Sequence, residues 1–515
     1  MARTLPLLRG NITLDRALND DGNVPIELRY PRQKQEFWKY LSARKDEIEA
    51  LVSFHLGVSR CRVDDESVWL SSRFNVCIPV HINTPSSARV VLVRIPLPYK
   101  VGEALCPGNV DEKLRCEVAT YIRMQEMCPD IPIPFLFGFG FPDGQMFTTP
   151  ENASFLSRLV WYARRTLRAF LRLPNPCRYV GRRRPDALKT GYMIISWVSQ
   201  GTMLSKSWDT LCHDKARRSN LFHGLARIML SLNRSHLPRI GSFTLDNQGF
   251  TTLTNRPLTL RLHRLENEGI PRSIGRTSTY SATDLYLLDL LGSHDNRICH
   301  QPNSIHSKAD GEQQLAALTM MRATLQHFTR PGYRYGPFVF SLTNLHQSNI
   351  FVDDKWNITS LIDLEWACSL PIEMQCPPYW LSGRAVDSIE PGEHLETFRQ
   401  IITEYFDAFE QEERDITGEE PLYQTPIMRK CWDTGSFWYF HAANSPKGLY
   451  RLFNEHIQPL FHPEHSEMPI FDEVVAPYWD VGAADMIERK IKEKEEYKDR
   501  LRELFEAPEV SLSMS

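Results

Sequence analysis

The spacing of apolar and polar residues over the first hundred positions predicts one helix followed by a group of strands. Apolar residues recur at helical intervals within residues 44–57: Ile48, Leu51, Val52 and Leu56. Short segments rich in valine and isoleucine follow at 68–70, 75–82 and 88–95, with polar turns between them. Closely spaced strands with short connections favour an antiparallel meander.

Helical periodicity dominates from residue 110 onward. The pattern predicts helices at 110–126, 221–232, 284–291 and 313–328, a hairpin at 240–249, and a buried strand at 192–198. Residues 484–506 carry charges of alternating sign, which predicts a solvated surface helix.

A basic amphipathic segment interrupts this pattern at about 150–190. Its apolar residues alternate with arginines at 158, 164, 165, 168 and 172, and three more arginines follow at 182–184. One interpretation is an insertion helix that covers the neighbouring part of the fold while its arginines are solvated. The other is weak peripheral contact with an anionic membrane surface through residues 155–184.

Composition narrows the class of protein. With 515 residues, 42% hydrophobic and 24% charged, the chain is expected to be globular, with two to four domains or lobes. A net charge of −3 gives no overall attraction to nucleic acid, so no nucleic-acid partner is expected. Eleven cysteines without a C-x-x-C pair, and an N-terminus without the apolar core of a signal peptide, predict a cytoplasmic protein.

Candidate chemistry is concentrated between residues 341 and 366. Asn349 directly precedes the apolar run Ile350–Val352, and Asp363 follows Leu361 and Ile362, with a turn-forming segment between the two runs. A loop, strand, turn and strand in this order would place Asn349 and Asp363 at one edge. Phosphoryl transfer requires oxygen ligands that hold Mg²⁺ against nucleotide phosphates, and these two side chains supply them. Taken singly, either residue would be an ordinary turn residue.

These residues resemble a known catalytic loop. The run Ser341–Asp354 (SLTNLHQSNIFVDD), followed by Ile362–Trp366 (IDLEW), is similar to the H-G-D-x-x-x-x-N and I-D-x-E motifs of the aminoglycoside phosphotransferase and choline kinase superfamily. The chain resembles a large fungal branch of that superfamily more closely, over roughly residues 60–460. The short motifs that carry this resemblance lie at 265–271 (LENEGIP), 301–303 (QPN), 336–338 (GPF) and 363–368 (DLEWAC).

The resemblance implies an α+β, two-lobed protein-kinase-like fold with ATP and Mg²⁺ between the lobes. Residues 58–198 would form a small antiparallel β N-lobe with the basic insertion, and residues 199–483 a larger, mainly helical C-lobe. Residues 1–57 would be an N-terminal extension with a helix, and residues 484–515 a charged C-terminal helix and tail.

Several functional positions follow from the resemblance. Asp363 corresponds to the principal metal ligand and Asn349 to the second. Arg94, in the strand at 88–95, corresponds to the basic residue that binds phosphates, and Glu117 on the next helix would be its partner. Alone, Arg94 and Glu117 would each be typical surface residues.

The remaining nucleotide contacts are expected at two further places. Ser196 and Val198 would belong to the hinge that contacts adenine. The turn that covers the phosphates, expected close to Gly-Ser-Phe-Asn, is Ser72–Asn75 (SRFN) here. Without glycine the backbone approaches phosphate less easily, although Arg73 can contact it electrostatically, beside Asn75.

Asn344 occupies the position of the catalytic aspartate. Its amide can orient an acceptor hydroxyl but cannot take the proton, and general-base assistance is worth about 10²- to 10⁴-fold. The expected function is ATP-dependent phosphoryl transfer to the hydroxyl of an unidentified small molecule, impaired by Asn344. The alternative is a pseudokinase that binds nucleotide or a partner and transfers nothing.

Overall fold

The computed structural model describes residues 3–84, 87–184, 188–418 and 421–507, and within these ranges eight strands form one antiparallel sheet. The strands are β3 (Cys61–Val63), β4 (Leu70–Ser71), β5 (Asn75–Thr84), β6 (Ser87–Pro96), β7 (Leu136–Gly140), β8 (Gln145–Thr148), β9 (Val180–Arg183) and β10 (Tyr192–Ser196). Their order is β3-β5-β6-β10-β7-β8-β9, and β4 pairs with β5.

The predicted meander is present with one change at its start. The strand expected at 68–70 begins only at Leu70, because residues 66–68 form a 3₁₀ turn. Asp65 caps that turn by accepting a hydrogen bond from the Ser67 backbone, and this local bond competes with strand formation.

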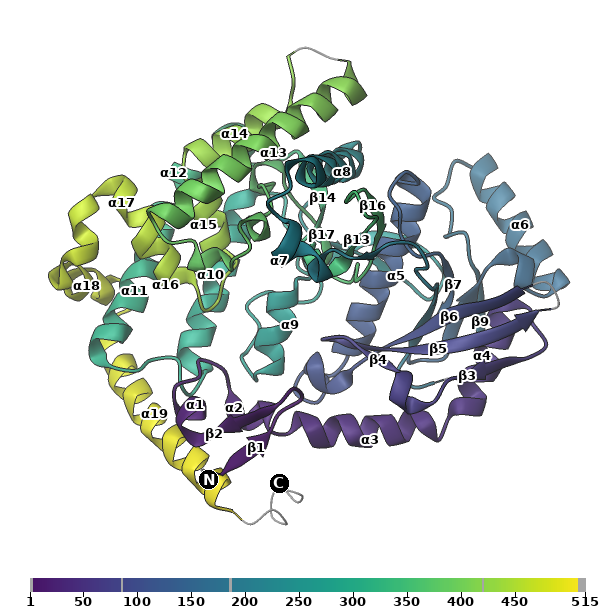
Figure 1. The fold of residues 1–515 in the computed structure, drawn as a ribbon, viewed down its shortest axis with the longest axis horizontal. Helices are drawn as coiled ribbons and strands as arrows, with labels where there is room; N and C mark the ends of the chain where they lie inside the picture. Colours follow the sequence, from purple (N-terminus) through teal and green to yellow (C-terminus); the bar gives the residue numbers. More distant parts are fainter. Residues whose placement is uncertain (1–2, 85–86, 185–187, 419–420, 508–515) are drawn as a thin grey trace.

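Alternation along β5 and β6 determines which side chains face which helix. Val76, Ile78 and Val80 pack on one face against the helix α4 (Lys45–Leu56), the helix predicted at 44–57. Arg94 lies opposite Cys77 of β5 and Met193 of β10, so it points to the other face. That face is covered by α5 (Asn109–Met127), the helix predicted at 110–126 (Figure 1).

A hairpin and two small sheets lie beyond α5. The hairpin expected at 240–249 is formed by β12 (Ser242–Leu245) and β13 (Thr251–Asn255). One small sheet has the order β11 (Thr202–Met203), β15 (Ile350–Val352) and β16 (Ile358–Leu361), and the other pairs β14 (Phe338–Leu342) with β17 (Ala367–Pro371).

Helices make up most of the remainder. The predicted helices at 221–232, 284–291 and 313–328 are all present and longer, and the last is divided at Thr324. The helices are α7 (Trp208–Leu211), α8 (Lys215–Asn233), α9 (Leu260–Asn267), α10 (Thr283–His300), α11 (Lys308–Ala323), α12 (Leu325–Phe328), α13 (Glu393–Thr417), α14 (Gln424–Asp433), α15 (Ser436–Ala443), α16 (Leu449–Leu452), α17 (Gln458–Phe461) and α18 (Pro469–Val475). The mixed α+β class of the fold is thereby confirmed.

The two ends of the described chain pack together, which corrects the prediction of a solvated tail helix. The helix α19 (Ala483–Glu506) buries Tyr497, Leu501 and Phe505. They contact apolar side chains from β1 (Thr4–Pro6), β2 (Asn11–Thr13), α1 (Leu14–Leu18) and α2 (Val24–Glu27), and α3 (Tyr30–Ser42) then leads toward the sheet (Figure 1). Lys490 and Lys494 occupy the buried side of α19 as well, and they conceal its apolar stripe in the sequence.

The basic insertion forms the helix α6 (Phe155–Phe170) at the edge of the molecule (Figure 1). None of its residues is buried, so it does not cover the neighbouring sheet with an apolar side as one interpretation expected. Within the described part of the chain, no helix is both long enough and apolar enough to cross a membrane.

Candidate functional site

The segment that contains Asn344 is held against the segment that contains Asp363. Strands β14 and β17 pair so that Leu342 lies opposite Ala367. Just beyond them, Thr343 donates two hydrogen bonds to the Trp366 carbonyl oxygen, from its backbone nitrogen at 2.9 Å and its hydroxyl at 2.7 Å. The pairing of the two strands therefore brings the loop 343–349 beside residues 363–366.

Asn349 and Asp363 lie at the same end of the β15–β16 hairpin, as their spacing predicts. Ile350 pairs with Leu361, and the Ile362 backbone nitrogen donates to the Asn349 carbonyl oxygen at 3.0 Å. The buried Asn349 side chain donates from its nitrogen to the Asn344 carbonyl oxygen at 2.9 Å. This bond orients the Asn349 amide and leaves its oxygen as the group that can coordinate a cation.

Asp363 adopts a backbone conformation that is uncommon for its residue type. Its φ is 56°, in the left-handed region, a conformation that costs energy for residues other than glycine. Residues held in such conformations cluster at functional sites. Its carboxylate contacts the Arg94 guanidinium, with Oδ1 at 2.6 Å from Nη1. Residues that are 269 positions apart in the sequence are thus in direct contact.

Arg94 is the centre of a buried group of charges. Among the described residues, three carboxylates contact its guanidinium: Asp363, Glu117 with Oε1 at 2.8 Å from Nε, and Glu365 with Oε2 at Nη2. The Arg94 side chain is only 5% exposed. The resemblance implied the pairing of Arg94 with Glu117 but assigned no role to Glu365, although Glu365 lies in the segment that resembles the I-D-x-E motif.

Lys113 completes this group and was not predicted. Its side chain is fully buried, and its Nζ lies 2.8 Å from Asn75 Oδ1 and 3.2 Å from one oxygen each of Glu117 and Glu365. Asn75 in turn donates to Glu365 at 2.8 Å. The only sequence feature that indicates a contact of Lys113 is its i,i+4 spacing from Glu117 on α5. We call the six residues Asn75, Arg94, Lys113, Glu117, Asp363 and Glu365 the Arg94 cluster.

The Arg94 cluster contains two cations and three carboxylates, which leaves an excess of one negative charge when all are ionised. Burial raises the pKa of Asp363 and of Glu117 above their ordinary values, even though Arg94 opposes this. Burial also acts on Glu365, but Lys113 and Arg94 outweigh it and lower the pKa of Glu365 to about 2. The excess charge therefore falls on Asp363 and Glu117, where a proton or a cation can neutralise it.

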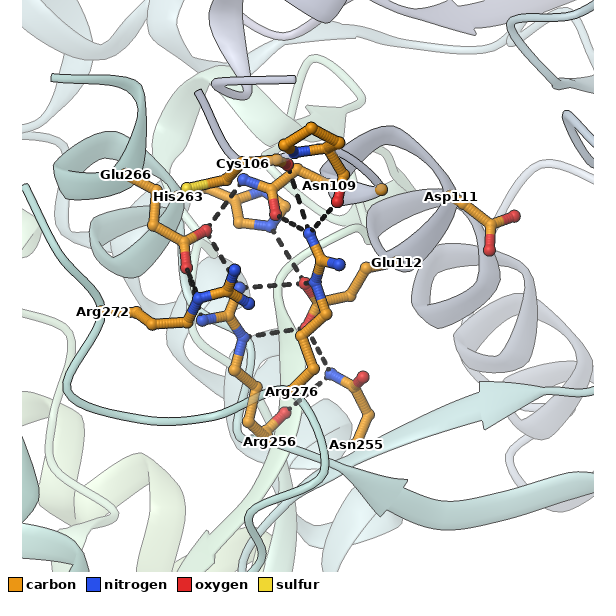
Figure 2. Close-up of polar contacts among 12 residues, drawn as sticks. Cys106, Asn109, Asp111, Glu112, Asn255, Arg256, His263, Glu266, Arg272 and Arg276 are labelled. Carbon is orange, nitrogen blue, oxygen red and sulfur yellow. Dashed lines mark hydrogen bonds and ion pairs between the residues drawn. The ribbon is translucent and has the colours of Figure 1, made fainter. Parts of the chain in front are cut away.

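A second buried charge cluster fixes α5 from its other side (Figure 2). Arg256 is fully buried and contacts both oxygens of Glu112, with Nε to Oε1 at 2.8 Å and Nη2 to Oε2 at 2.9 Å. Its Nη1 lies 2.7 Å from Glu266 Oε1 on α9, and Arg276 adds a 3.1 Å contact to Glu112. Asp111 points away from this group (Figure 2).

The two clusters together define the rotation of α5. Glu112 lies one residue before Lys113, so the bonds between Arg256 and Glu112 set the direction in which Lys113 and Glu117 project. A buried Arg bound bidentately to a carboxylate has a more restricted geometry than a Lys ion pair. Arg256 is therefore a positioning residue for the Arg94 cluster.

The remaining predicted residues lie outside this arrangement of contacts. Arg73 is exposed in the turn between β4 and β5, where the Ser72 backbone donates to the Asn75 carbonyl oxygen at 2.9 Å. Ser196 exchanges two hydrogen bonds with Phe135, both at 2.9 Å, and Val198 is half-buried. Contact of Arg73, Ser196 and Val198 with nucleotide remains a prediction.

The protein oxygens at this site can coordinate Mg²⁺ only together with ligands from other molecules. Among the described residues, no group of three or more His, Cys, Asp or Glu side chains is placed to hold a metal ion. Asp363 and Asn349 offer one carboxylate and one amide oxygen. Mg²⁺ commonly takes one or two protein oxygens and completes its shell with phosphates and water, so this pair fits a metal that arrives with a nucleotide.

Comparisons with known proteins do not assign a family. No protein-family model matches the chain, and no curated protein matches it. Among solved structures, a macrolide 2'-phosphotransferase type I is similar over 85% of this chain and 97% of its own, with a TM-score of 0.34 and 8% identity. The interpretation of the site rests on its own geometry.

Proposed function

We propose that this chain is a kinase-like phosphotransferase in which residues 58–198 and 199–483 form two lobes around a Mg²⁺-ATP site. The observation that carries the proposal is the position of Arg94. From β6 it contacts both Glu117 on α5 and Asp363 beyond β16, which joins three distant segments at one point.

Each member of the site has a distinct role in this proposal. Arg94, held by Glu117, binds nucleotide phosphates, and Asp363 with Asn349 holds Mg²⁺, which neutralises the charge on those phosphates. Asn344 orients the acceptor hydroxyl of a small molecule. An amide cannot accept the proton, so the lost base assistance of about 10²- to 10⁴-fold makes transfer slow.

A pseudokinase is the second candidate, and a specific observation favours it. Arg94 already contacts three carboxylates and is nearly inaccessible, so phosphates must compete with Asp363 and Glu365 for its donors. With Asn344 in the catalytic position as well, nucleotide binding without transfer is a coherent function for the same residues.

A thermal-shift titration tests nucleotide binding without knowledge of the acceptor. Wild type is compared with Asp363→Asn and with the control Asp354→Asn, an exposed residue in the nearby β15–β16 turn. A ligand at a hundredfold excess over its dissociation constant stabilises a protein by about 2.7 kcal/mol. With ~2.1 cal/mol/K of unfolding entropy per residue and 515 residues, this corresponds to a shift of roughly 2–3 °C.

Both candidate functions predict that Mg²⁺-ATP raises the melting temperature of wild type and Asp354→Asn, and that Asp363→Asn loses the shift. No shift in any of the three proteins would refute both. Asn344→Asp, assayed with ATP and a panel of amino alcohols, sugars and aminoglycosides, separates the two functions. A gain of about 10²-fold or more supports the phosphotransferase, whereas nucleotide binding without any transfer supports the pseudokinase.

A further inference from the structure

The helix α6 presents its apolar side to solvent. Its most exposed large apolar residues are Phe155, Leu156, Leu159, Val160, Leu167 and Phe170, and Phe170 reaches 83% exposure. At 3.6 residues per turn these residues, with Leu171, cover an arc of about 160° that contains no charged side chain. Surface helices of globular proteins normally turn such an arc toward the core.

The opposite side of α6, which carries arginines, faces the rest of the molecule. Arg165 donates to the Pro176 carbonyl oxygen at 3.0 Å, and Arg168 donates to that of Pro174 at 2.7 Å. The Arg168 guanidinium also lies 4.8 Å from the ring centre of Phe250. The outward direction of the apolar arc is therefore set by specific contacts on the other side of the helix.

The sheet offers α6 little to pack against. Leu156 and Val160 line a groove of about 430 Å³ between α6, the β8–β9 edge and the β12–β13 turn. Both residues remain more than two-thirds exposed despite this position. Among the described residues, the apolar arc of α6 is therefore largely uncovered.

The charge of the surrounding segment indicates what covers this arc. Residues 154–184 contain nine arginines and no Asp, Glu or Lys, although the whole chain has a net charge of −3. Arg172, Arg182 and Arg183 are exposed beyond the helix. An apolar arc bordered by cations alone complements a surface that is apolar inside and anionic at its edge.

We propose that α6 docks on an anionic lipid bilayer, with its apolar arc at the boundary between headgroups and acyl chains and the exposed arginines Arg172, Arg182 and Arg183 on lipid phosphates. A 16-residue helix is about 24 Å long, shorter than a hydrocarbon core of about 30 Å, so it lies on the bilayer and does not span it. A second copy of the chain is a poor occupant, because it would bring two arginine-rich segments together without a carboxylate in either.

Vesicle co-sedimentation of the full-length protein tests this proposal. The probes are phosphatidylcholine vesicles with and without phosphatidylserine. Leu167→Glu places a charge in the apolar arc at a residue that is 59% exposed, and Leu285→Glu on α10 is the matched control at 58% exposure. Neither substitution enters the core, so both variants are expected to fold, and their melting temperatures check this.

We expect binding to phosphatidylserine vesicles to exceed binding to phosphatidylcholine alone by about tenfold or more, and to weaken with salt. Leu167→Glu should lose about tenfold in binding, and Leu285→Glu should match wild type. Equal loss in both variants, or no sedimentation of wild type, would overturn the proposal. So would an oligomer in solution that Leu167→Glu dissociates, because that result assigns the arc to a second copy. None of these measurements depends on nucleotide, so they stand apart from the proposed function.

Discussion

Replacing Lys113 by methionine should destabilise the protein by several kcal/mol, although it keeps the length and most of the volume of the side chain. Lys113 is fully buried and contacts Asn75, Glu117 and Glu365 at 2.8 to 3.2 Å. The substitution leaves Arg94 as the single cation beside three carboxylates. Removal of one partner from a buried ion pair costs about 3–5 kcal/mol, a large part of a typical stability of about 5–15 kcal/mol.

The loss should depend on pH in a defined direction. Without Lys113, the pKa values of Glu117 and Glu365 in the folded protein rise, because burial is no longer opposed by this ammonium group. The folded state then binds more protons than the unfolded state, so the stability of the variant falls as pH rises. The difference between wild type and Lys113→Met should therefore be larger at pH 8 than at pH 5.

Urea denaturation followed by tryptophan fluorescence measures this effect, since Lys113 Nζ lies 5.8 Å from the ring centre of Trp366. Glu365→Gln provides the second arm of a double-mutant cycle. The double variant has one cation and two carboxylates, which restores the original excess of one negative charge. We expect a favourable coupling energy of about 1–3 kcal/mol between the two substitutions.

Lys308→Met is the control for loss of a lysine as such, because its side chain is 75% exposed and forms one surface ion pair with Glu312. Its cost should stay below about 1 kcal/mol. A cost of less than about 1 kcal/mol for Lys113→Met, or strictly additive effects with Glu365→Gln, would refute the account of the Arg94 cluster as a coupled set of buried charges.

Two further predictions concern other buried charges. Burial raises the pKa of Glu373 to about 7, so the contribution of this one carboxyl to stability is complete below pH 4.5 and is lost as pH rises through 7. Glu373→Gln should then stabilise the protein by up to about 3 kcal/mol at pH 8 and have little effect at pH 4.5. Urea denaturation at the two pH values measures this difference, and equal effects at both would contradict the prediction. Arg256→Met should cost about 3–5 kcal/mol by leaving Glu112 and Glu266 buried without this cation, and Arg256→Lys should recover only part of it. Full recovery by lysine would argue against the bidentate geometry as the source of the stability.

The pairing of Arg94 with Glu117 could be predicted only through the resemblance to the aminoglycoside phosphotransferase and choline kinase superfamily, because each residue alone is typical of a protein surface. The periods of β6 and α5 predicted that a strand and a helix are present, but not which of their polar side chains meet. The role of Lys113 could not be predicted in the same way. In the sequence, Lys113 resembles any solvated lysine on a helix, and its burial depends on contact with Glu365, which lies 252 residues later.

The prediction of a solvated tail helix and the interpretation of the basic segment as a covering helix failed for a related reason. An amphipathic pattern specifies that a helix has two sides but not what faces each side. In α19 the charged residues concealed a stripe that packs against the N-terminal segment, and Tyr497 and Leu501 became core residues. In α6 the apolar pattern was visible, yet the contacts of Arg165 and Arg168 turn it outward. In both helices, contacts with residues outside the helix determine which side faces the solvent.

In the proposed function, the charge of the Arg94 cluster determines the form in which nucleotide binds. With an excess of one negative charge, the cluster repels the phosphates of free ATP, and burial strengthens that repulsion. Neutralisation at Asp363 is required first, by a proton or by a divalent cation bound with the nucleotide. In the proposed function, ATP in the presence of EDTA should therefore bind at least about tenfold more weakly than Mg²⁺-ATP at pH 8, which corresponds to about 1.4 kcal/mol. The difference should narrow as pH falls, because protonation of the raised-pKa carboxyls removes the same charge. Equal affinities with and without Mg²⁺ at pH 8 would show that phosphates do not approach Arg94 and Asp363.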